Sequence, residues 1–180
     1  METKTKWVID PSHSEIAFKV KHLMISNVKG TFGEFEAQVL TDGSDFSTAE
    51  INFSLKAASI DTGSADRDTH LRSADFFDAE NFKELTFKAT SFKPTGDDTF
   101  ALSGDLTIKG ISKPVKLEVE FGGLMSDPWG NEKAGFSING KINRKDWGLN
   151  WNAALEAGGV LVGEEVRINC ELELLKVKAQ

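Results

Sequence analysis

The sequence is poor in the residue types that cross-link small secreted proteins or span a bilayer. Its 180 residues include one cysteine, four prolines and no tyrosine. With Cys170 alone, no intramolecular disulfide can form, and its apolar neighbours at two-residue spacing predict a buried, inert thiol. No apolar run approaches the ~18 residues of a membrane span, so we expect no stable membrane insertion.

The chain also lacks an excess of basic residues. Lys+Arg number 21 and Asp+Glu number 28, which gives a net charge of −7. Nucleic-acid-binding proteins normally carry a basic patch or stripe, so no nucleic-acid partner is expected. Residues 1–6 contain no apolar signal segment. This predicts a cytoplasmic location for the sequence as given, or a periplasmic one if a secretion signal was trimmed.

What the sequence does contain is period-two alternation of apolar and polar residues from end to end. Alternation of this kind is typical of strands with one buried face. About eight such runs, separated by turn residues, predict an all-β protein, either a sandwich or a closed antiparallel barrel. We favour the barrel because closure removes exposed edge strands. The alternating apolar sets are Ile16–His22, Ile51–Ala57, Leu85–Ala89, Phe100–Ile108, Val115–Phe121, Ala134–Ile142 and Val166–Leu174.

Two segments depart from this pattern. Residues 64–75 lack β-branched alternation and predict a short helix with Ser64 as its N-cap, placed to cover one end of a barrel. Between Thr31 and Thr41 the apolar phase changes, and Gly30 and Gly33 predict a β-bulge there. No linker divides the chain, so we expect one domain over residues 1–180.

The same residues carry a family resemblance along nearly the whole chain. In sequence order, the segments are Asp10–Ser14, Phe18–His22, Ser59–Gly63, Arg67–Ser73, Asp75–Asp78, Gly104–Gly110, Lys113–Val115, Asp127–Gly130, Ile142–Arg144, Trp147–Leu149 and Gly158–Gly163. They resemble the YceI-like family. The resemblance implies an extended, lipocalin-like eight-stranded barrel whose cavity holds a long apolar lipid of the polyisoprenoid or isoprenoid-quinone type. It also implies a homodimer, and a secretion signal in many members.

Alternation and resemblance together predict a lipid site on the inward face. Small inward residues (Ala57, Ala89, Gly104, Ala134 and Gly140) are expected to leave room, although alternation alone is equally compatible with a filled core. The expected wall is Phe18, Val20, His22, Phe53, Leu55, Phe87, Leu106, Phe121, Phe136 and Ile138, and Phe76 and Phe77 would narrow the mouth. Arg67, His70 and Arg72 are predicted contacts for a polar head group.

The sequence gives little support for catalysis. It has no nucleophile elbow, phosphate-binding loop or dinucleotide fingerprint, and the spacing of His13, His22 and His70 matches no compact metal motif. Arg144 is expected to pair with a nearby acid. We therefore expect non-catalytic binding or carriage of a long-chain lipid, with no cofactor or metal. The alternatives are a filled barrel acting as a protein-interaction module, and a small lipid-modifying enzyme.

Overall fold

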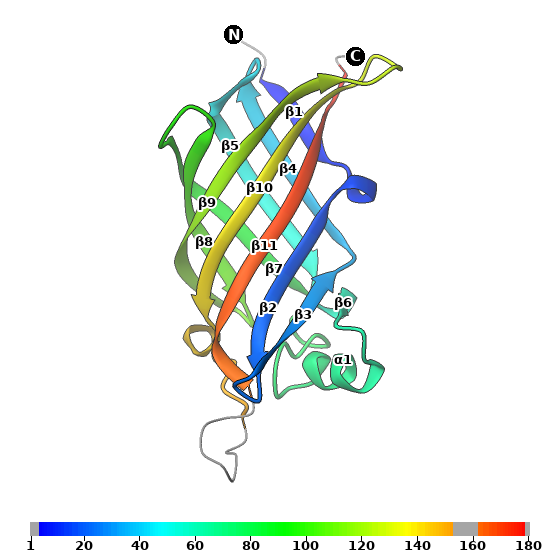
Figure 1. Cartoon of the computed structure of the whole chain (residues 1–180), viewed down its shortest axis with the longest axis vertical. Coiled ribbons are helices and arrows are strands. Elements are labelled where there is room, and N and C mark those ends of the chain that lie inside the picture. Colours follow the sequence, from blue (N-terminus) through cyan, green and yellow to red (C-terminus); the bar gives the residue numbers. More distant parts are fainter. Residues whose placement is uncertain (1–3, 153–161, 179–180) are drawn as a thin grey trace.

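The computed structural model describes residues 4–152 and 162–178, and its strands form one continuous antiparallel sheet (Figure 1). Eight of the strands (β1, β4, β5, β7, β8, β9, β10 and β11) close into a barrel because β1 pairs with both β4 and β11. This confirms the predicted fold class. The elements are β1 (Thr5–Ile9), η1 (Pro11–His13), β2 (Glu15–His22), β3 (Ser26–Phe32), β4 (Phe35–Asp42), β5 (Asp45–Lys56), η2 (Ala57–Ser59), β6 (Ile60–Asp61), α1 (Ala65–Arg72), β7 (Glu84–Pro94), β8 (Thr99–Ile108), β9 (Ile111–Ser126), β10 (Glu132–Asn143), η3 (Arg144–Trp147) and β11 (Val162–Lys176).

Strands β1 and β2 follow one another along the same edge of β11, separated by η1. Ile9 pairs with Leu174, and after the 3-10 turn Glu15 pairs with Glu171. Asp10 caps this turn: its carboxylate accepts hydrogen bonds from the Ser12 backbone N–H (3.1 Å) and the Ser12 hydroxyl (2.7 Å). These bonds and the contact with His13 lower the pKa of Asp10 to about 2.

This capping predicts a pH-dependent effect of Asp10→Asn. A carboxyl group whose pKa is lowered in the folded state stabilises that state above its unfolded pKa, and the contribution is lost as the pH falls through the folded value. The native protein should therefore be more stable than Asp10→Asn above about pH 4, and the difference should shrink toward about pH 2. Urea denaturation across this range measures it, with Asp97→Asn on the exposed β7–β8 turn as control. A difference that stays constant with pH would contradict this role.

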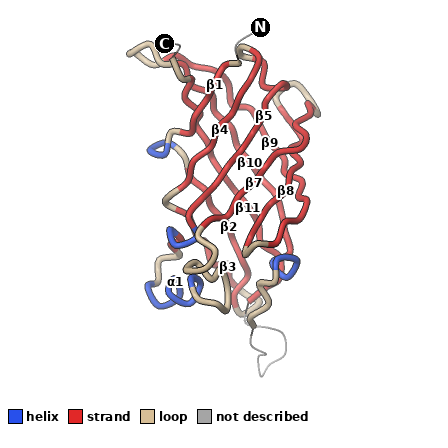
Figure 2. The backbone as a smooth tube through the Cα atoms, turned by 180° about the vertical axis from the view of Figure 1, so that it is seen from behind, coloured by secondary structure: helices blue, strands red, loops and turns tan. Residues whose placement is uncertain are grey.

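The change of apolar phase after Thr31 is a break between strands, so the predicted bulge is wrong. β3 ends at Phe32 and β4 begins at Phe35. The Gly33 N–H donates to the carbonyl of Ser59 in η2 (3.1 Å) and not to a neighbouring strand. Beyond the break, β4 pairs with β1 and β5. β3, before the break, pairs with β2 on one edge and with only the two-residue β6 on the other. The sheet divides at this point, and the segment carrying α1 lies there (Figure 2).

The predicted helical insertion is confirmed as α1. Ser64 precedes it with extended dihedrals and accepts a hydrogen bond from the Arg67 N–H. The helix lies at the end of the barrel opposite the chain termini (Figure 1). It is attached by Asp68, which is buried and accepts two hydrogen bonds from Thr62, at 2.9 Å from the backbone N–H and 2.5 Å from the hydroxyl. Among the described residues, no helix is long and apolar enough to cross a membrane.

At the β1 end, an aromatic cluster fills the barrel. Trp7 is fully buried, and its indole N–H donates to Thr41 Oγ1 (2.9 Å). The ring centroid of Phe46 lies 4.9 Å from that of Trp7, 5.0 Å from that of Phe136 and 5.6 Å from that of Phe121. Rings packed in this way exclude water, so this end of the barrel is sealed.

Candidate functional site

An apolar cavity of about 580 Å³ runs inside the barrel below this cluster. Its volume lies within the ~300–1,000 Å³ typical of ligand pockets. The structure places eleven of the twelve predicted wall and mouth residues on its surface: Phe18, Val20, His22, Phe53, Leu55, Phe76, Phe77, Phe87, Leu106, Phe136 and Ile138. Phe121 is absent from the described lining and packs instead against Phe46 and Phe136 in the aromatic cluster.

The inward side chains show which part of the barrel is hollow. Along β10, Ala134 is buried, whereas Ile138 and Ile142 farther along the strand are only half-buried. Along β2, Ile16 is buried and Val20 is half-buried. An inward side chain can be exposed only to a space inside the barrel. The barrel is therefore packed at the β1 end and open toward the end that carries α1.

Small inward residues do not create this space as expected. A Cβ atom on Gly104 would lie 2.5 Å from the Phe87 ring and from the Lys88 carbonyl oxygen, and one on Gly140 would lie 2.3 Å from Leu117. Larger neighbours already occupy the room at both glycines, and Ala57 and Ala134 are fully buried. The prediction that these positions leave a void is wrong at Gly104 and Gly140, because an adjacent strand fills the gap.

The charged residues and histidines of the lining gather at one end of the cavity. They come from the end of β2, from α1 and from η3, whereas the long strands supply almost only apolar side chains. The cavity is thus an apolar tube with a polar mouth beside α1. The residues are Lys21, His22, Asp66, Arg67, His70 and Arg144.

Two of the three predicted head-group residues lie at this mouth. Arg67 donates from Nε to Thr62 Oγ1 and from Nη2 to the Thr62 carbonyl, both at 2.7 Å, so its guanidinium is held in place on the lining. His70 lies 2.9 Å from Asp75 through Nε2, and its ring contacts Trp151 edge-on with centroids 4.6 Å apart.

Arg72 does not reach the cavity. Its Nε donates to the Ala58 carbonyl (3.0 Å) and its Nη2 to the Ile60 carbonyl (3.4 Å), which ties α1 to η2 and β6. Arg72 is therefore part of the attachment of the helix and not of the mouth. It lies on the side of α1 that faces β6, whereas Arg67 and His70 line the cavity.

Arg144 lies at the mouth, although the sequence predicted for it only an ion pair with a nearby acid. It is 3% exposed, and its guanidinium donates to the carbonyls of Leu149 (2.5 Å), Gly163 (2.8 Å), Trp151 (2.9 Å) and Val162 (3.3 Å). In the described part of the chain, no carboxylate lies within ion-pair distance of it, so the expected pairing with an acid is wrong. Burial lowers the pKa of this guanidinium from its ordinary value.

The thiol of Cys170 and a cluster of potential metal ligands near η1 could in principle be reactive, but their neighbours make both roles unfavourable. Cys170 is buried on the cavity wall, and desolvation raises the pKa of its thiol to about 11, which makes it a poor nucleophile. Asp10, His13 and Glu173 place three potential metal-ligand atoms within 4.8 Å of one another. Lys133 lies among them, with Nζ 2.9 Å from Glu173 and 3.5 Å from Asp10, and already supplies the cation there.

The comparison with known proteins agrees with this architecture. The YceI-like domain matches residues 7–174. The chain belongs to the YceI-like family. This YceI-like protein is 39% identical to a UPF0312 protein of Staphylococcus aureus strain N315 over 170 residues, which cover 94% of this chain and 96% of the relative. It is 41% identical over the same coverage to a UPF0312 protein of Staphylococcus epidermidis. Residues 158–161 of the family segments quoted above lie outside the described residues.

Solved structures share the fold. The YceI-like barrel matches the YceI protein of Campylobacter jejuni with a TM-score of 0.75 at 33% identity, over 88% of this chain and 90% of that one. BcnA of Burkholderia cenocepacia matches with a TM-score of 0.77 at 23% identity, over 92% and 98% of the two chains. A polyisoprenoid binding domain from Saccharophagus degradans matches with a TM-score of 0.67 at 14% identity, over 95% and 98%. At these lower identities, the last two show a shared fold alone.

Proposed function

We propose that this protein binds and carries a long-chain isoprenoid-type lipid in its barrel, without transforming it. The observation that carries the proposal is the separation of polarity inside the cavity, with an apolar tube behind and charged and histidine side chains at the mouth. A polyisoprenoid or isoprenoid quinone has the matching division into a long hydrocarbon chain and a small polar head. A structural neighbour with the same fold, described as polyisoprenoid binding, agrees with this choice.

The chain of the lipid would lie along the aromatic and aliphatic wall. Each Å² of apolar surface removed from water contributes roughly 25 cal/mol, so a partly buried chain suffices for stable binding. The cavity wall is rich in phenylalanine, and the protein as a whole has 13 phenylalanines and no tyrosine. A wall of this kind binds hydrocarbon through contact area without requiring a hydrogen bond from the ligand.

The head group would lie beside Arg67 and His70. Both are positioned by other residues, Arg67 by Thr62 and His70 by Asp75, and both line the cavity at its open end. A hydroxyl, carbonyl or phosphate oxygen is the acceptor that such donors recognise. Arg67 and His70 are held in hydrogen bonds within the protein, and Asp66, the acid among the described lining residues, is exposed. This arrangement favours binding over acid–base chemistry.

Native mass spectrometry of the purified protein, followed by organic extraction, tests the proposal. We expect a stoichiometric adduct of isoprenoid or quinone mass, or a one-to-one adduct after adding solanesol, a long-chain polyprenol, to the delipidated protein. Failure of the folded, delipidated protein to take up solanesol would contradict lipid carriage and favour the filled-barrel interaction module. Recovery of a chemically altered lipid would instead support the enzyme alternative.

A further inference from the structure

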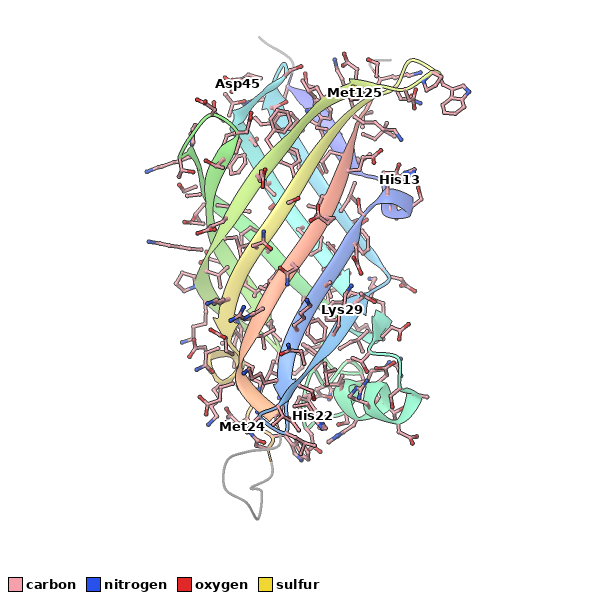
Figure 3. The ribbon with its side chains drawn as sticks, in the orientation of Figure 1. His13, His22, Met24, Lys29, Asp45 and Met125 are labelled. Carbon is pink, nitrogen blue, oxygen red and sulfur yellow. The ribbon has the colours of Figure 1, made fainter. Side chains whose placement is uncertain are left out.

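The turn between β2 and β3 exposes three consecutive apolar side chains. Leu23, Met24 and Ile25 are 40%, 53% and 86% exposed, and they form the tip of the hairpin that His22 and Ser26 close. Figure 3 shows Met24 and His22 at the lower end of the barrel, the end that carries α1. Exposed apolar residues that are contiguous in this way mark a surface that contacts something other than water.

The backbone of this tip is also strained. Leu23 and Met24 have φ values of +55° and +65°, a region that glycine and asparagine adopt easily and that branched or long side chains rarely do. Such residues persist at functional sites, where the strain is offset by another role. Neither local backbone preference nor solvation explains why leucine and methionine occupy these two positions.

The tip is continuous with the cavity mouth. Lys21 and His22 precede it and Val28 follows it shortly after, and all three line the cavity. A surface that the tip contacts would therefore lie directly against the opening. This arrangement connects the apolar tip to the proposed passage of lipid in and out of the barrel.

The charge around the tip differs from that of the rest of the protein. From residue 16 to residue 33 there is no acidic residue, in a chain with a net charge of −7. Lys19 and Lys21 are basic residues of this stretch, and so is Lys29, whose Nζ lies 3.0 Å from Glu15. The acids that begin the neighbouring β11 have their own cationic partners: Glu164 lies 2.7 Å from Lys145 Nζ, and Glu165 lies near Lys141 and Arg167. An apolar tip that follows Lys19 and Lys21 along β2 is complementary to an anionic lipid surface.

From these observations we infer that the tip formed by Leu23, Met24 and Ile25 docks on an anionic bilayer and holds the cavity mouth against it. The inference rests on the proposed lipid carriage and names the surface from which the lipid comes. The apolar side chains enter the boundary between head groups and acyl chains, and Lys21 and Lys19 reach the lipid phosphates. A bound lipid can then leave or enter the bilayer without its chain crossing water.

The hairpin between β9 and β10 provides a matched control at the opposite end (Figure 3). It exposes Met125 (77%) and Trp129 (79%), but Gly130 takes the positive φ and Asp127 caps the turn by accepting from the Trp129 and Asn131 N–H groups. The turn is therefore unstrained and acidic, and it lies far from the mouth. Apolar exposure alone would make both hairpins bind membranes equally.

Vesicle flotation distinguishes the two tips. The native protein should float with phosphatidylcholine vesicles that contain about 30% phosphatidylglycerol, and added salt should weaken the binding. We expect Met24→Ser with Ile25→Ser to lower the partition coefficient about tenfold, and Met125→Ser with Trp129→Ser to change it less than about twofold. Leu23→Asn with Met24→Gly should also lower it about tenfold while keeping or raising thermal stability, because those residues suit the turn.

Native-like flotation of either β2–β3 variant, or no flotation of the native protein, would overturn the docking site. Uptake of solanesol from ethanol into the delipidated protein, without vesicles, separates the two proposals: uptake without flotation removes the docking site and leaves lipid carriage intact. If the β2–β3 changes alter the sedimentation coefficient and leave flotation unchanged, the tip is an interface between copies of the chain, which also overturns the docking site.

Discussion

Replacing Ile138 by tryptophan is expected to lower the long-chain lipid bound to the purified protein at least about tenfold while the barrel stays folded. Ile138 lies half-way along β10, between Cys170 of β11 and Val119 of β9, and its half-buried side chain faces the cavity. The added indole would occupy open space and not a packed core, so little strain is expected. Losing roughly 55 Å² of apolar contact costs about 1.4 kcal/mol, a factor of ten in affinity.

The control for this variant is the next residue along the strand. Asn139 lies on the exposed outer face of β10, so Asn139→Trp adds the same indole outside the barrel. Lipid extraction with mass spectrometry should show native occupancy in Asn139→Trp and depletion in Ile138→Trp, at similar melting temperatures. If the folded Ile138→Trp protein keeps its lipid, the ligand does not lie along this wall.

Replacing Arg144 by methionine is expected to lower the free energy of unfolding by about 4 kcal/mol. The guanidinium satisfies four main-chain carbonyls, and the bonds to Leu149 and Trp151 on one side and to Val162 and Gly163 on the other join two parts of the chain. Methionine fills a similar volume but donates no hydrogen bond. The carbonyls of Leu149, Trp151 and Gly163 then lose this buried donor, whereas that of Val162 still accepts from the Asn152 amide (2.8 Å).

Urea denaturation measures this effect, with Arg167→Met as the comparison. Arg167 lies on the outer face of β11, its side chain is mostly exposed, and its ion pair with Glu165 spans 3.7 Å. An exposed pair contributes little, so we expect a change of about 0.5 kcal/mol or less. Similar losses in the two variants would show that the carbonyls around Arg144 find water or other donors when the guanidinium is removed.

Much of the barrel and its inner face followed from the alternation of the sequence, because in a strand every second side chain points to the same side. Phe18, Phe53 and Ile138 were assigned to the inner face in this way, and they line the cavity. Alternation gives the face of a residue but not its height along the barrel. Phe121 has the expected phase, but it pairs with Phe136 near the sealed end, next to Phe46, and therefore belongs to the aromatic cluster.

Features that depend on distant contacts could not be predicted. The hydrogen-bond partners of Arg144 are main-chain carbonyls, which leave no signal in side-chain chemistry. The room beside Gly140 depends on the conformation of Leu117 in the neighbouring strand. The split after Phe32 arises because Gly33 pairs with Ser59, a contact that forms only once η2 has folded back on the barrel. The pattern of residues near each position in the sequence does not reveal any of these three contacts.

If the barrel carries a lipid as proposed, the aromatic cluster of Trp7, Phe46, Phe121 and Phe136 would limit how deep its chain can enter. A hydrocarbon that enters a tube with one opening must go in tail first and leave head first, and it cannot be threaded through. Each further isoprene unit adds contact only until the tail reaches Phe46, and longer chains leave their surplus outside the mouth. Selection among isoprenoids would then depend on chain length, because the distance from the mouth to the aromatic cluster sets the longest chain that the barrel can bury completely.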